Sequence, residues 1–222
     1  MAEPILIAGD LLDELLSKGF YRMQQNMFTT SITFANNEYM EVFWLRTILP
    51  SLTDIYSHKI YKLNKGFKVS ISPAAITAQM DELYEIYFKH IDFDASDTIY
   101  NYLHAGEHIL QFDSYKIEVW DGETLIAVGF FDKGNKAVTG ILNFYHPEYK
   151  KYSLGKYLML LKMQFAISCQ MDYYYTGYLS PDYPKFDYKV FPDPDLIEVF
   201  IPELNVWVPY RDWKDNLNST QL

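Results

Sequence analysis

Cysteine is nearly absent from this sequence of 222 residues, because Cys169 is the single one. One thiol excludes an internal disulfide and any metal site built from several cysteines. No run approaches the roughly 20 consecutive apolar residues of a membrane-spanning helix, and the N-terminus lacks a basic stretch followed by a secretory hydrophobic segment. We therefore expect a cytoplasmic protein without a metal or a membrane partner, in which Cys169 is a small core residue.

Positive charge is also scarce, since 19 Lys and Arg residues face 29 Asp and Glu residues, for a net charge of −10. This balance disfavours indiscriminate binding of nucleic acid. The charges are unevenly placed, however: residues 81–132 hold two lysines, whereas residues 145–189 hold six. The sequence thus allows a limited contact with one phosphate-bearing end and argues against a long footprint on a duplex.

What the sequence has in abundance is aromatic residues, which make up 18% of the chain and include 20 tyrosines. Tyrosine suits a half-wet cleft, because its ring is buried while its hydroxyl keeps a hydrogen bond. Hydrophobic residues make up 49% of the chain, enough for the core of one large domain or two small ones. We expect an N-terminal helix with a small β region at 1–72 and a second domain at 73–222.

The central pattern is strand, turn, helix and strand. A strand is predicted at 137–145 and ends at His146-Pro147, a helix is predicted at 154–169, and a second strand at 173–180. Such a βαβ unit places its two strands in parallel.

The turn before the predicted helix carries a possible anion site. Ser153 is positioned to cap the helix, Gly155 allows close approach of a ligand or another backbone, and Lys156 adds positive charge. Free amides at a helix N-terminus suit a phosphate. An ordinary capped helix with a tight entry turn has the same pattern, so both interpretations stay open.

The rest of the chain supplies antiparallel strands and helices. We expect helices at 8–18, 77–91 and 96–103, hairpins at 27–48, 109–131 and 199–210, a strand at 67–71, an edge strand or binding loop at 186–191, and a frayed tail at 214–222. The predicted fold class is α+β, with a mixed, mainly antiparallel sheet and packed helices. That order is similar to the Gcn5-related N-acyltransferase architecture, in which the two parallel strands splay apart.

Four ordered motifs carry a more specific resemblance. They are DGETLIAVGFFDKG at 121–134, GILNFYHPEYKKYSLGKYLMLLK at 140–162, YYYTGYLS at 173–180 and FDYKVF at 186–191. Together they resemble the arginyl-tRNA–protein transferase family, with its bacterial leucyl-transferring relatives. Weaker likeness extends to Arg22 and Arg46, each expected to be a surface or ion-paired arginine. The family's N-terminal cysteine cluster is missing, His146 replaces an Asp and Phe186 replaces a Met.

The resemblance implies transfer of an aminoacyl group from the 3′ end of tRNA to the N-terminal amine of proteins that begin with Asp or Glu, which would mark them for degradation. Aminoacyl-tRNA would be the co-substrate, and no cofactor is implied. The motifs favour arginine as the donor amino acid and leave leucine open. Two other functions stay open: an N-acyltransferase that uses acyl-coenzyme A, and a non-catalytic peptide-binding relative.

The same resemblance suggests roles for residues around the expected cleft. The amides of Leu154, Gly155 and Lys156 would face the terminal phosphates or adenosine, and Lys150 and Lys151 would add backbone contacts.

Tyrosine and ionisable residues would act on the reacting groups. Tyr145 would orient the ester or stack on the terminal adenine, and Tyr178 would donate a proton or orient the substrate, with a core position as the alternative for both. Asp132 would bind a cationic group and His146 would act as a base, with a turn role as its alternative. Lys189, beside Tyr188 in the substrate-binding motif, would neutralise a phosphate or an acidic acceptor side chain.

Overall fold

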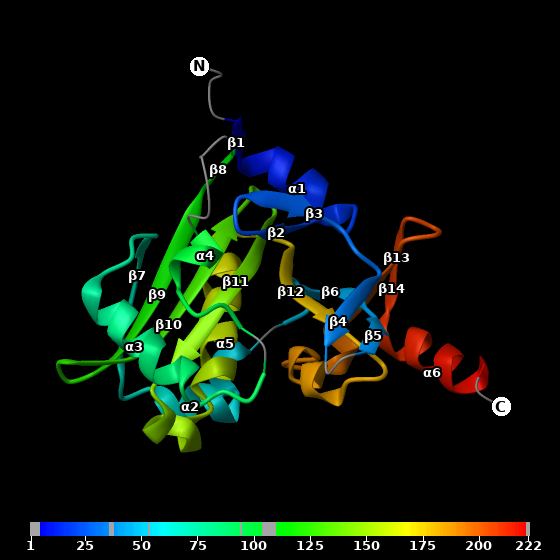
Figure 1. The fold of residues 1–222 in the computed structure, drawn as a ribbon. Helices are drawn as coiled ribbons and strands as arrows, with labels where there is room; N and C mark the ends of the chain where they lie inside the picture. Colours follow the sequence, from blue (N-terminus) through cyan, green and yellow to red (C-terminus); the bar gives the residue numbers. More distant parts are fainter. Residues whose placement is uncertain (1–4, 36–37, 53, 94, 104–109, 221–222) are drawn as a thin grey trace.

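An eight-stranded sheet organises the computed structural model, which describes residues 5–35, 38–52, 54–93, 95–103 and 110–220 (Figure 1). Within this eight-stranded sheet every neighbouring pair of strands is antiparallel except β11 and β12, so the predicted α+β class with a mixed, mainly antiparallel sheet is confirmed. In sheet order the strands are β14 (Val206–Pro209), β13 (Ile197–Ile201), β6 (Phe43–Ile48), β12 (Tyr173–Leu179), β11 (Ala137–Tyr145), β10 (Thr124–Lys133), β9 (Ser114–Asp121) and β7 (Lys68–Pro73). The strands of this sheet come from both sides of residue 72, where the sequence predicted a boundary between two regions.

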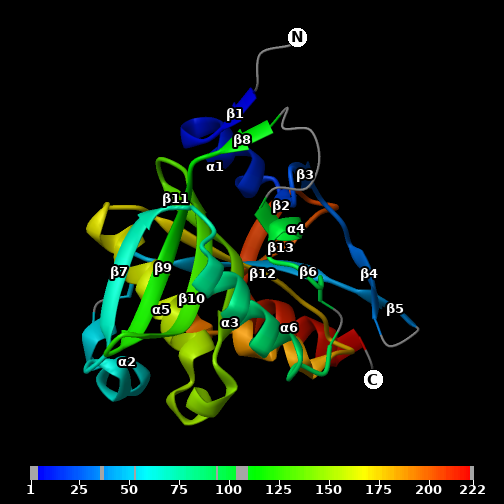
Figure 2. The same ribbon diagram turned by 60° about the vertical axis from the view of Figure 1, so that its left-hand side comes forward.

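Helices cover both faces of the sheet (Figure 2). Apolar residues of α5 share one buried cluster with Phe131 and Val138, and those of α3 share another with Phe130 and Phe144. Because side chains alternate along a strand, Phe130 and Phe131 serve the two faces in turn. The helices are α1 (Gly9–Ser17), α2 (Lys59–Asn64), α3 (Ala78–Phe88), α4 (Tyr100–Leu103), α5 (Leu154–Ser168) and α6 (Tyr210–Thr220).

Short elements complete the fold. The small strand pairs are β1 (Ile5–Ile7) with β8 (Leu110–Phe112), β2 (Tyr21–Met23) with β3 (Asn26–Phe28), and β4 (Ile32–Ala35) with β5 (Glu38–Glu41). The 3₁₀ helices are η1 (Ile55–Ser57), η2 (Pro147–Tyr152), η3 (Pro184–Lys189) and η4 (Pro194–Leu196). The N-terminal α1 lies over one end of the sheet, and α6 lies beside β13 and β14 (Figure 1).

Several sequence predictions needed correction. The strand expected from residue 109 is divided, because Leu110–Phe112 pairs with β1 and the hairpin strand starts at Ser114. The hairpin expected at 27–48 is smaller, since Phe43–Ile48 joins the central sheet beside β12. Residues 186–191 form no strand, because a 3₁₀ helix begins at Pro184. The helix expected at 96–103 covers Tyr100–Leu103, and its expected stop at Gly106 lies outside the described residues.

Two predictions about single segments were wrong for reasons of packing. The tail is helical through Thr220, because Trp213 is buried in a cluster with Leu45 and Leu179 and anchors α6. Cys169 is exposed, because it lies at the C-terminal cap of α5, beyond the last buried turn. By contrast, α3 begins at the later of two starts that the sequence allows, Ser72-Pro73 and Thr77, and the Oγ1 of Thr77 accepts a hydrogen bond from Met80 N at 3.4 Å.

Candidate active site

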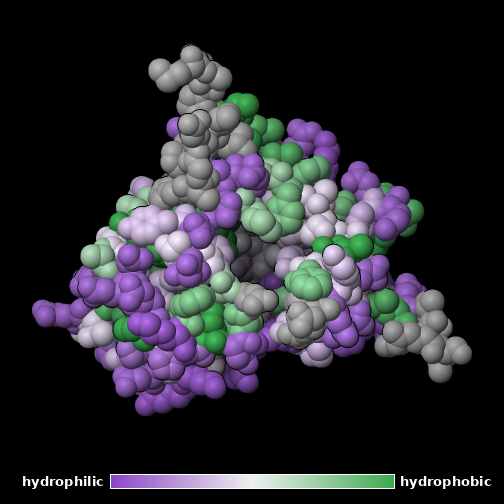
Figure 3. Space-filling model, viewed as in Figure 1, coloured by the Kyte–Doolittle hydropathy of each residue, from purple (hydrophilic) through white to green (hydrophobic). Residues whose placement is uncertain are grey.

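A splay between the two parallel strands forms the candidate site. Strands β11 and β12 pair over three residues, from Ala137 opposite Tyr173 to Thr139 opposite Tyr175. Beyond them β11 continues to Tyr145 and β12 to Leu179 without further pairing. The surface is hollowed near its centre, in the region between these strands (Figure 3). The splay that the resemblance implied is therefore present.

Two β-bulges explain why the strands separate at this point. Against β10, the register of β11 shifts so that Ile141 is an extra residue between Gly140 and Leu142. Against β6, the register of β12 shifts so that Thr176 is extra between Tyr175 and Gly177. A bulge bends its strand and strengthens the local twist. Because each bulge begins one or two residues after the last shared pair, the two strands bend away from each other there.

Lys162 fills the vertex of the splay from α5. Its Nζ donates to Phe130 O at 2.7 Å, to Leu142 O at 3.3 Å and to the Asn143 side chain at 2.8 Å. Those acceptors flank the β11 bulge and match the three donors of an ammonium group. Complete burial lowers the pKa of Lys162 to about 7, against an opposing effect of the Asp132 carboxylate. Lys162 therefore clamps the bulge that opens the site.

Sequence reasoning missed Lys162, although a signal was present. Lys162 lies four and eight residues after Leu158 and Leu154, so it shares their buried helical face. A lysine on an apolar face needs buried acceptors. Gly129 leaves room for it, because a Cβ there would lie 3.1 Å from Lys162 Cε and 2.8 Å from Asn143 Oδ1.

Asp132 lies near the same vertex, opposite Thr139, and is fully buried in an ion pair. Its Oδ1 lies 2.8 Å from Arg22 Nη1, and side-chain exposure is 0% for Asp132 and 2% for Arg22. Ser114 also donates to Asp132, and Arg22 donates to Leu103 O at 3.0 Å. Burial raises the pKa of Asp132, while Arg22 opposes that shift. The carboxylate is thus engaged inside the fold, and its contact with a substrate cation stays a prediction.

Arg22 and Arg46 are both ion-paired, as expected. Arg46 Nε lies 2.6 Å from Glu198 Oε2, and its guanidinium stacks over Tyr173 at 4.0 Å.

Lys189 occupies the other end of the splay, at the end of η3. Its Nζ donates to Tyr178 O at 2.7 Å and lies 4.5 Å from the ring centroids of Tyr178 and Phe186. None of the described carboxylates lies within ion-pair distance of it. Burial lowers the pKa of Lys189 to about 7. The structure therefore places an amine that titrates near neutrality beside Gly177, where β12 bends.

Tyrosines surround this mouth of the splay. Tyr145 packs against Tyr87 with ring centroids 5.6 Å apart, and its Cε1 would lie 3.5 Å from a Cβ at Gly155. Although 49% of Tyr188 is exposed, its hydroxyl is enclosed by protein, which raises the pKa of Tyr188 to about 12. Repulsion from the ionised hydroxyls of Tyr178 and Tyr145 contributes to that shift. The predicted residues Tyr145, Tyr178, Tyr188 and Lys189 are thus brought together.

The N-terminus of α5 reaches the same mouth through Gly155. The amides of Leu154, Gly155 and Lys156 belong to the first helical turn and have no intrahelical acceptor. Ser153 occupies the predicted N-cap position of α5, but its backbone is left-handed, with φ 53°, and its side chain makes no capping hydrogen bond. Lys156 Nζ lies 5.3 Å from the ring centroid of Phe191, and Lys150 and Lys151 are exposed on the preceding 3₁₀ helix.

His146 has the contacts of a turn residue. Its Nδ1 accepts a hydrogen bond from Glu148 N at 3.4 Å and caps η2, and its ring packs edge-on against Tyr149. Its role as a base stays a prediction.

Other regions of the described chain are distinct from this mouth. A separate cavity of about 410 Å³, lined by Tyr61, Phe67 and Phe165 among others, lies between β7 and α5, and none of the predicted site residues lines it.

No three His, Cys, Asp or Glu residues gather as metal ligands within the described ranges. No described helix has the length and apolar character to cross a membrane.

Comparisons with known proteins agree with these motifs. The family described as "Arginine-tRNA-protein transferase, C terminus" matches residues 79–195, just over half of the chain. An aspartate/glutamate leucyltransferase of Acinetobacter baylyi is 30% identical over 139 residues, which cover 59% of this chain and 49% of the relative. The chain thus spans about half the length of that relative. An aspartate/glutamate leucyltransferase of Leptospira interrogans is 22% identical over 217 residues, covering 95% of this chain and 83% of the relative.

Solved structures show weaker likeness. FemX is similar with a TM-score of 0.48 and 11% identity, over 81% of this chain and 64% of that one. The C-terminal domain of a putative lysylphosphatidylglycerol synthetase from Agrobacterium fabrum is similar with a TM-score of 0.47 and 8% identity, over 78% of this chain and 53% of that one. The family match, in contrast, contains both splayed strands, Lys162 and the mouth around Lys189. The chain belongs to the arginine-tRNA-protein transferase family.

Proposed function

We propose that this chain is an aminoacyl-tRNA–protein transferase that moves an aminoacyl group from the 3′ end of charged tRNA to the N-terminal amine of a protein. The observation that supports it most is the splay, which brings an amine of lowered pKa and several tyrosines to the N-terminus of α5. The relatives are named aspartate/glutamate leucyltransferases, so acceptors that begin with Asp or Glu are the first to test. Leucine and arginine are both candidate donors, and the protein would act in the cytoplasm, where charged tRNA is made.

The reaction needs positioning more than covalent assistance. The acceptor nitrogen attacks the ester carbonyl, a C–N bond forms, and the C–O bond to the terminal ribose breaks. An aminoacyl ester is already activated, so orientation of the two groups and stabilisation of the oxyanion supply most of the rate. The ammonium proton must leave the acceptor before attack, and a proton must reach the departing ribose oxygen.

Lys189 is the residue we assign to that proton. With its pKa lowered to about 7, a large share of Lys189 is neutral at physiological pH and can accept the proton of the acceptor ammonium. Its single described hydrogen bond, to Tyr178 O, leaves donor and acceptor capacity free. The protonated Lys189 would then give that proton to the ribose oxygen, and the second proton that the nitrogen loses as the amide forms would pass through the neutral Lys189 to solvent. This role replaces the charge-neutralising role that the sequence suggested, and the two can be separated by experiment.

The tRNA end would enter beside α5. The first-turn amides of Leu154, Gly155 and Lys156 suit a terminal phosphate, and Tyr145, against Gly155, offers a ring for the terminal adenine. Aminoacyl-tRNA would be the co-substrate and no other cofactor is needed.

The direct test is transfer of labelled leucine or arginine from charged tRNA to peptides that begin with Asp, Glu or Ala. We expect transfer to Asp and Glu peptides from at least one donor. No transfer from either donor would reject the proposal, and turnover of acetyl-coenzyme A instead would favour an acyl-coenzyme A enzyme. Peptide binding without turnover would favour a non-catalytic relative.

Variants of Lys189 test its role. Lys189→Met should lower kcat by roughly 10²-fold or more if the amine moves the proton. Lys189→Arg keeps the positive charge but cannot release its proton, so a proton-transfer role predicts loss in both variants. Retention of activity in Lys189→Arg would instead indicate binding of an acidic acceptor side chain. Lys185→Met is the matched control, because Lys185 lies in the same 3₁₀ helix but pairs with Asp92.

A further inference from the structure

An acid-free basic segment lies next to the splay in an otherwise acidic chain. Between Asp54 and Asp81 the sequence contains four lysines and one histidine but no Asp or Glu. Lys59 and Lys62 are exposed on α2, Lys65 is its exposed C-terminal cap, and Lys150 and Lys151 are exposed on η2. We call these five residues the α2–η2 lysine surface.

The lysines of this surface form no ion pairs with the described residues, although Glu148 lies in the same 3₁₀ helix as Lys150 and Lys151. The electrostatic effect of Lys150 on Asp92 is weak, since Lys185 is the main cause that lowers the pKa of Asp92 and the charge of Lys150 is the last of the causes. None of the five lysines lies within ion-pair distance of any carboxylate in the described ranges, whereas Lys18, Lys89 and Lys185 each have such a partner. Five neighbouring cations repel one another, and a protein of net charge −10 has many carboxylates that could have been placed among them. The complement of such a surface is a polyanion.

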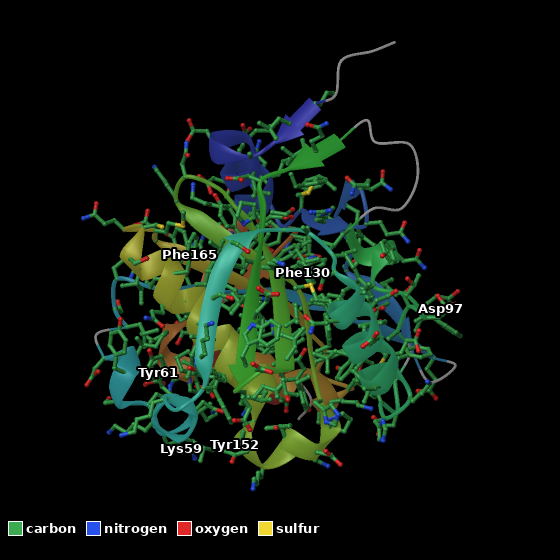
Figure 4. All side chains as sticks on the ribbon, turned by 90° about the vertical axis from the view of Figure 1, so that its left-hand side faces the viewer. Lys59, Tyr61, Asp97, Phe130, Tyr152 and Phe165 are labelled. Atoms are coloured by element: carbon green, nitrogen blue, oxygen red, sulfur yellow. The ribbon has the colours of Figure 1, made fainter. Side chains whose placement is uncertain are left out.

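Side-chain packing holds the lysine surface in a fixed position relative to the catalytic splay. Asn64 is buried in α2, and its Nδ2 donates to Ile60 O at 2.8 Å and to Tyr152 O at 2.9 Å. The ring of Tyr61 packs against Tyr157 on α5, and that of Phe67 packs against Tyr152. Lys59 and Tyr152 lie close to the same lower edge of the molecule (Figure 4). The lysines are therefore displayed by a packed unit joined to η2 and α5.

The surface continues directly to the place assigned to the tRNA end. His58, which caps α2, packs edge-on against Phe191 with ring centroids 5.1 Å apart. Lys156 Nζ lies over the same Phe191 ring. Phosphates that follow the lysines of α2 and η2 would thus lead to the first turn of α5.

We propose that the α2–η2 lysine surface binds the phosphate backbone of the tRNA acceptor stem and so directs the charged 3′ end into the splay. This inference rests on the proposed function and adds the surface that would contact the acceptor stem of the donor tRNA. The contacts are to backbone phosphates, so they give affinity and position without reading base sequence. The surface spans few cations, which agrees with binding one short helical stem.

The test compares two triple variants with the same change of charge. Lys59→Gln/Lys62→Gln/Lys65→Gln removes the new part of the surface. Lys18→Gln/Lys136→Gln/Lys214→Gln removes three exposed lysines of other regions and serves as the control. None of these six residues belongs to the proposed reaction site, and equal thermal unfolding of both variants confirms that the fold is kept.

Transfer is measured with two donors, full-length charged tRNA and a short aminoacylated RNA that ends in CCA. For the first variant we expect KM for full-length tRNA to rise about tenfold with little change in kcat. The slope of log binding constant against log salt concentration should become shallower by roughly two to three, because about that many fewer counterions are released on binding. With the short donor, KM should stay within about twofold of the wild-type value. The control variant should match the wild type with both donors.

A binding measurement keeps the inference testable even without turnover. Uncharged bulk tRNA and vesicles of phosphatidylglycerol are titrated with the wild type and both variants. Weaker tRNA binding in the first variant alone supports the surface, even if the wild type transfers nothing and the proposed function fails. Equal tRNA affinity in both variants, equal loss with the short donor, or lysine-dependent binding to vesicles but not to tRNA would overturn it.

Discussion

The vertex and the mouth of the splay each contain a lysine, and the fully buried Lys162 and the half-buried Lys189 differ in their partners. Burial lowers the pKa of both Lys162 and Lys189 to about 7. Lys162 donates to three acceptors that flank a β-bulge, whereas Lys189 has one described acceptor and a wall of aromatic rings. The same chemical group is therefore fully engaged at the vertex and has spare capacity at the mouth.

The two lysines differ in role: Lys162 and its neighbours at the vertex hold the shape of the site, whereas Lys189 at the mouth is free to interact with a substrate. Charges at the vertex are paired inside the fold: Lys162 has three acceptors, and Asp132 pairs with Arg22 through Oδ1, although its buried Oδ2 has no hydrogen-bond partner among the described residues. Satisfied buried networks rigidify a structure. An amine with few partners can instead exchange a proton or bind a new group. Changes at the vertex should therefore act on stability, and changes at the mouth on the reaction.

The largest effect is expected from Arg22→Met. Removing one partner of a buried ion pair leaves an uncompensated charge, here the Asp132 carboxylate, and costs roughly 3–5 kcal/mol of unfolding free energy. Chemical denaturation measures this loss. Lys18→Met is the control, because it breaks a solvent-exposed pair with Glu14 and should change the free energy of unfolding far less. Similar losses in both variants would show that the vertex does not depend on its buried pair.

The strand and helix pattern of the splay was predictable from the sequence, because its hydrophobic periods are long and regular. The predicted strand at 137–145 matches β11, and the predicted helix at 154–169 ends one residue later than α5. The tail was mispredicted because a polar composition hides the few apolar residues that anchor α6, namely Trp213, Tyr210 and Leu217. Local hydrophobic periodicity predicts which segments form helices and strands, whereas packing against residues distant in the sequence determines where those helices and strands end.

The proximity of several residues predicted for the site is seen in the structure, whereas the β-bulges that shape their surroundings were not predicted. Tyr145, Tyr178, Tyr188 and Lys189 do meet at the mouth. The bulges after Thr139 and Tyr175 arise from pairing with β10 and β6, which no local pattern encodes. The same holds for the pairing of Asp132 with Arg22, which are 110 residues apart.

The second prediction concerns the pH dependence of stability through Lys162. Because the folded-state pKa is lowered to about 7, the folded state binds fewer protons than the unfolded state between pH 7 and the ordinary lysine range. Stability therefore rises with pH in that window, and the cost of burying the ammonium is fully present below it. Relative to Lys162→Met, the wild type should gain roughly 2–3 kcal/mol between pH 7 and pH 9.

The titration of Lys189 affects the unfolding free energy of the wild type and of Lys162→Met equally, so it cancels in the difference between them. The measurement is urea unfolding at several pH values, with Lys136→Met as an exposed control that should show no pH-dependent difference from the wild type. A constant difference between the wild type and Lys162→Met across this window would mean that Lys162 stays charged in the fold.

The smallest effect is expected at the mouth, from Gly177→Ala. Gly177 has φ +101°, a conformation that residues with a Cβ rarely adopt, so the change should cost about 1–2 kcal/mol of unfolding free energy. A Cβ there would lie 3.5 Å from Lys189 Nζ, an ordinary contact, so the pH profile of transfer should stay unchanged. Gly66→Ala, with open space and no left-handed backbone, should be nearly neutral in thermal unfolding. A shifted pH profile in Gly177→Ala would show that backbone strain at the β12 bend also sets the protonation of Lys189.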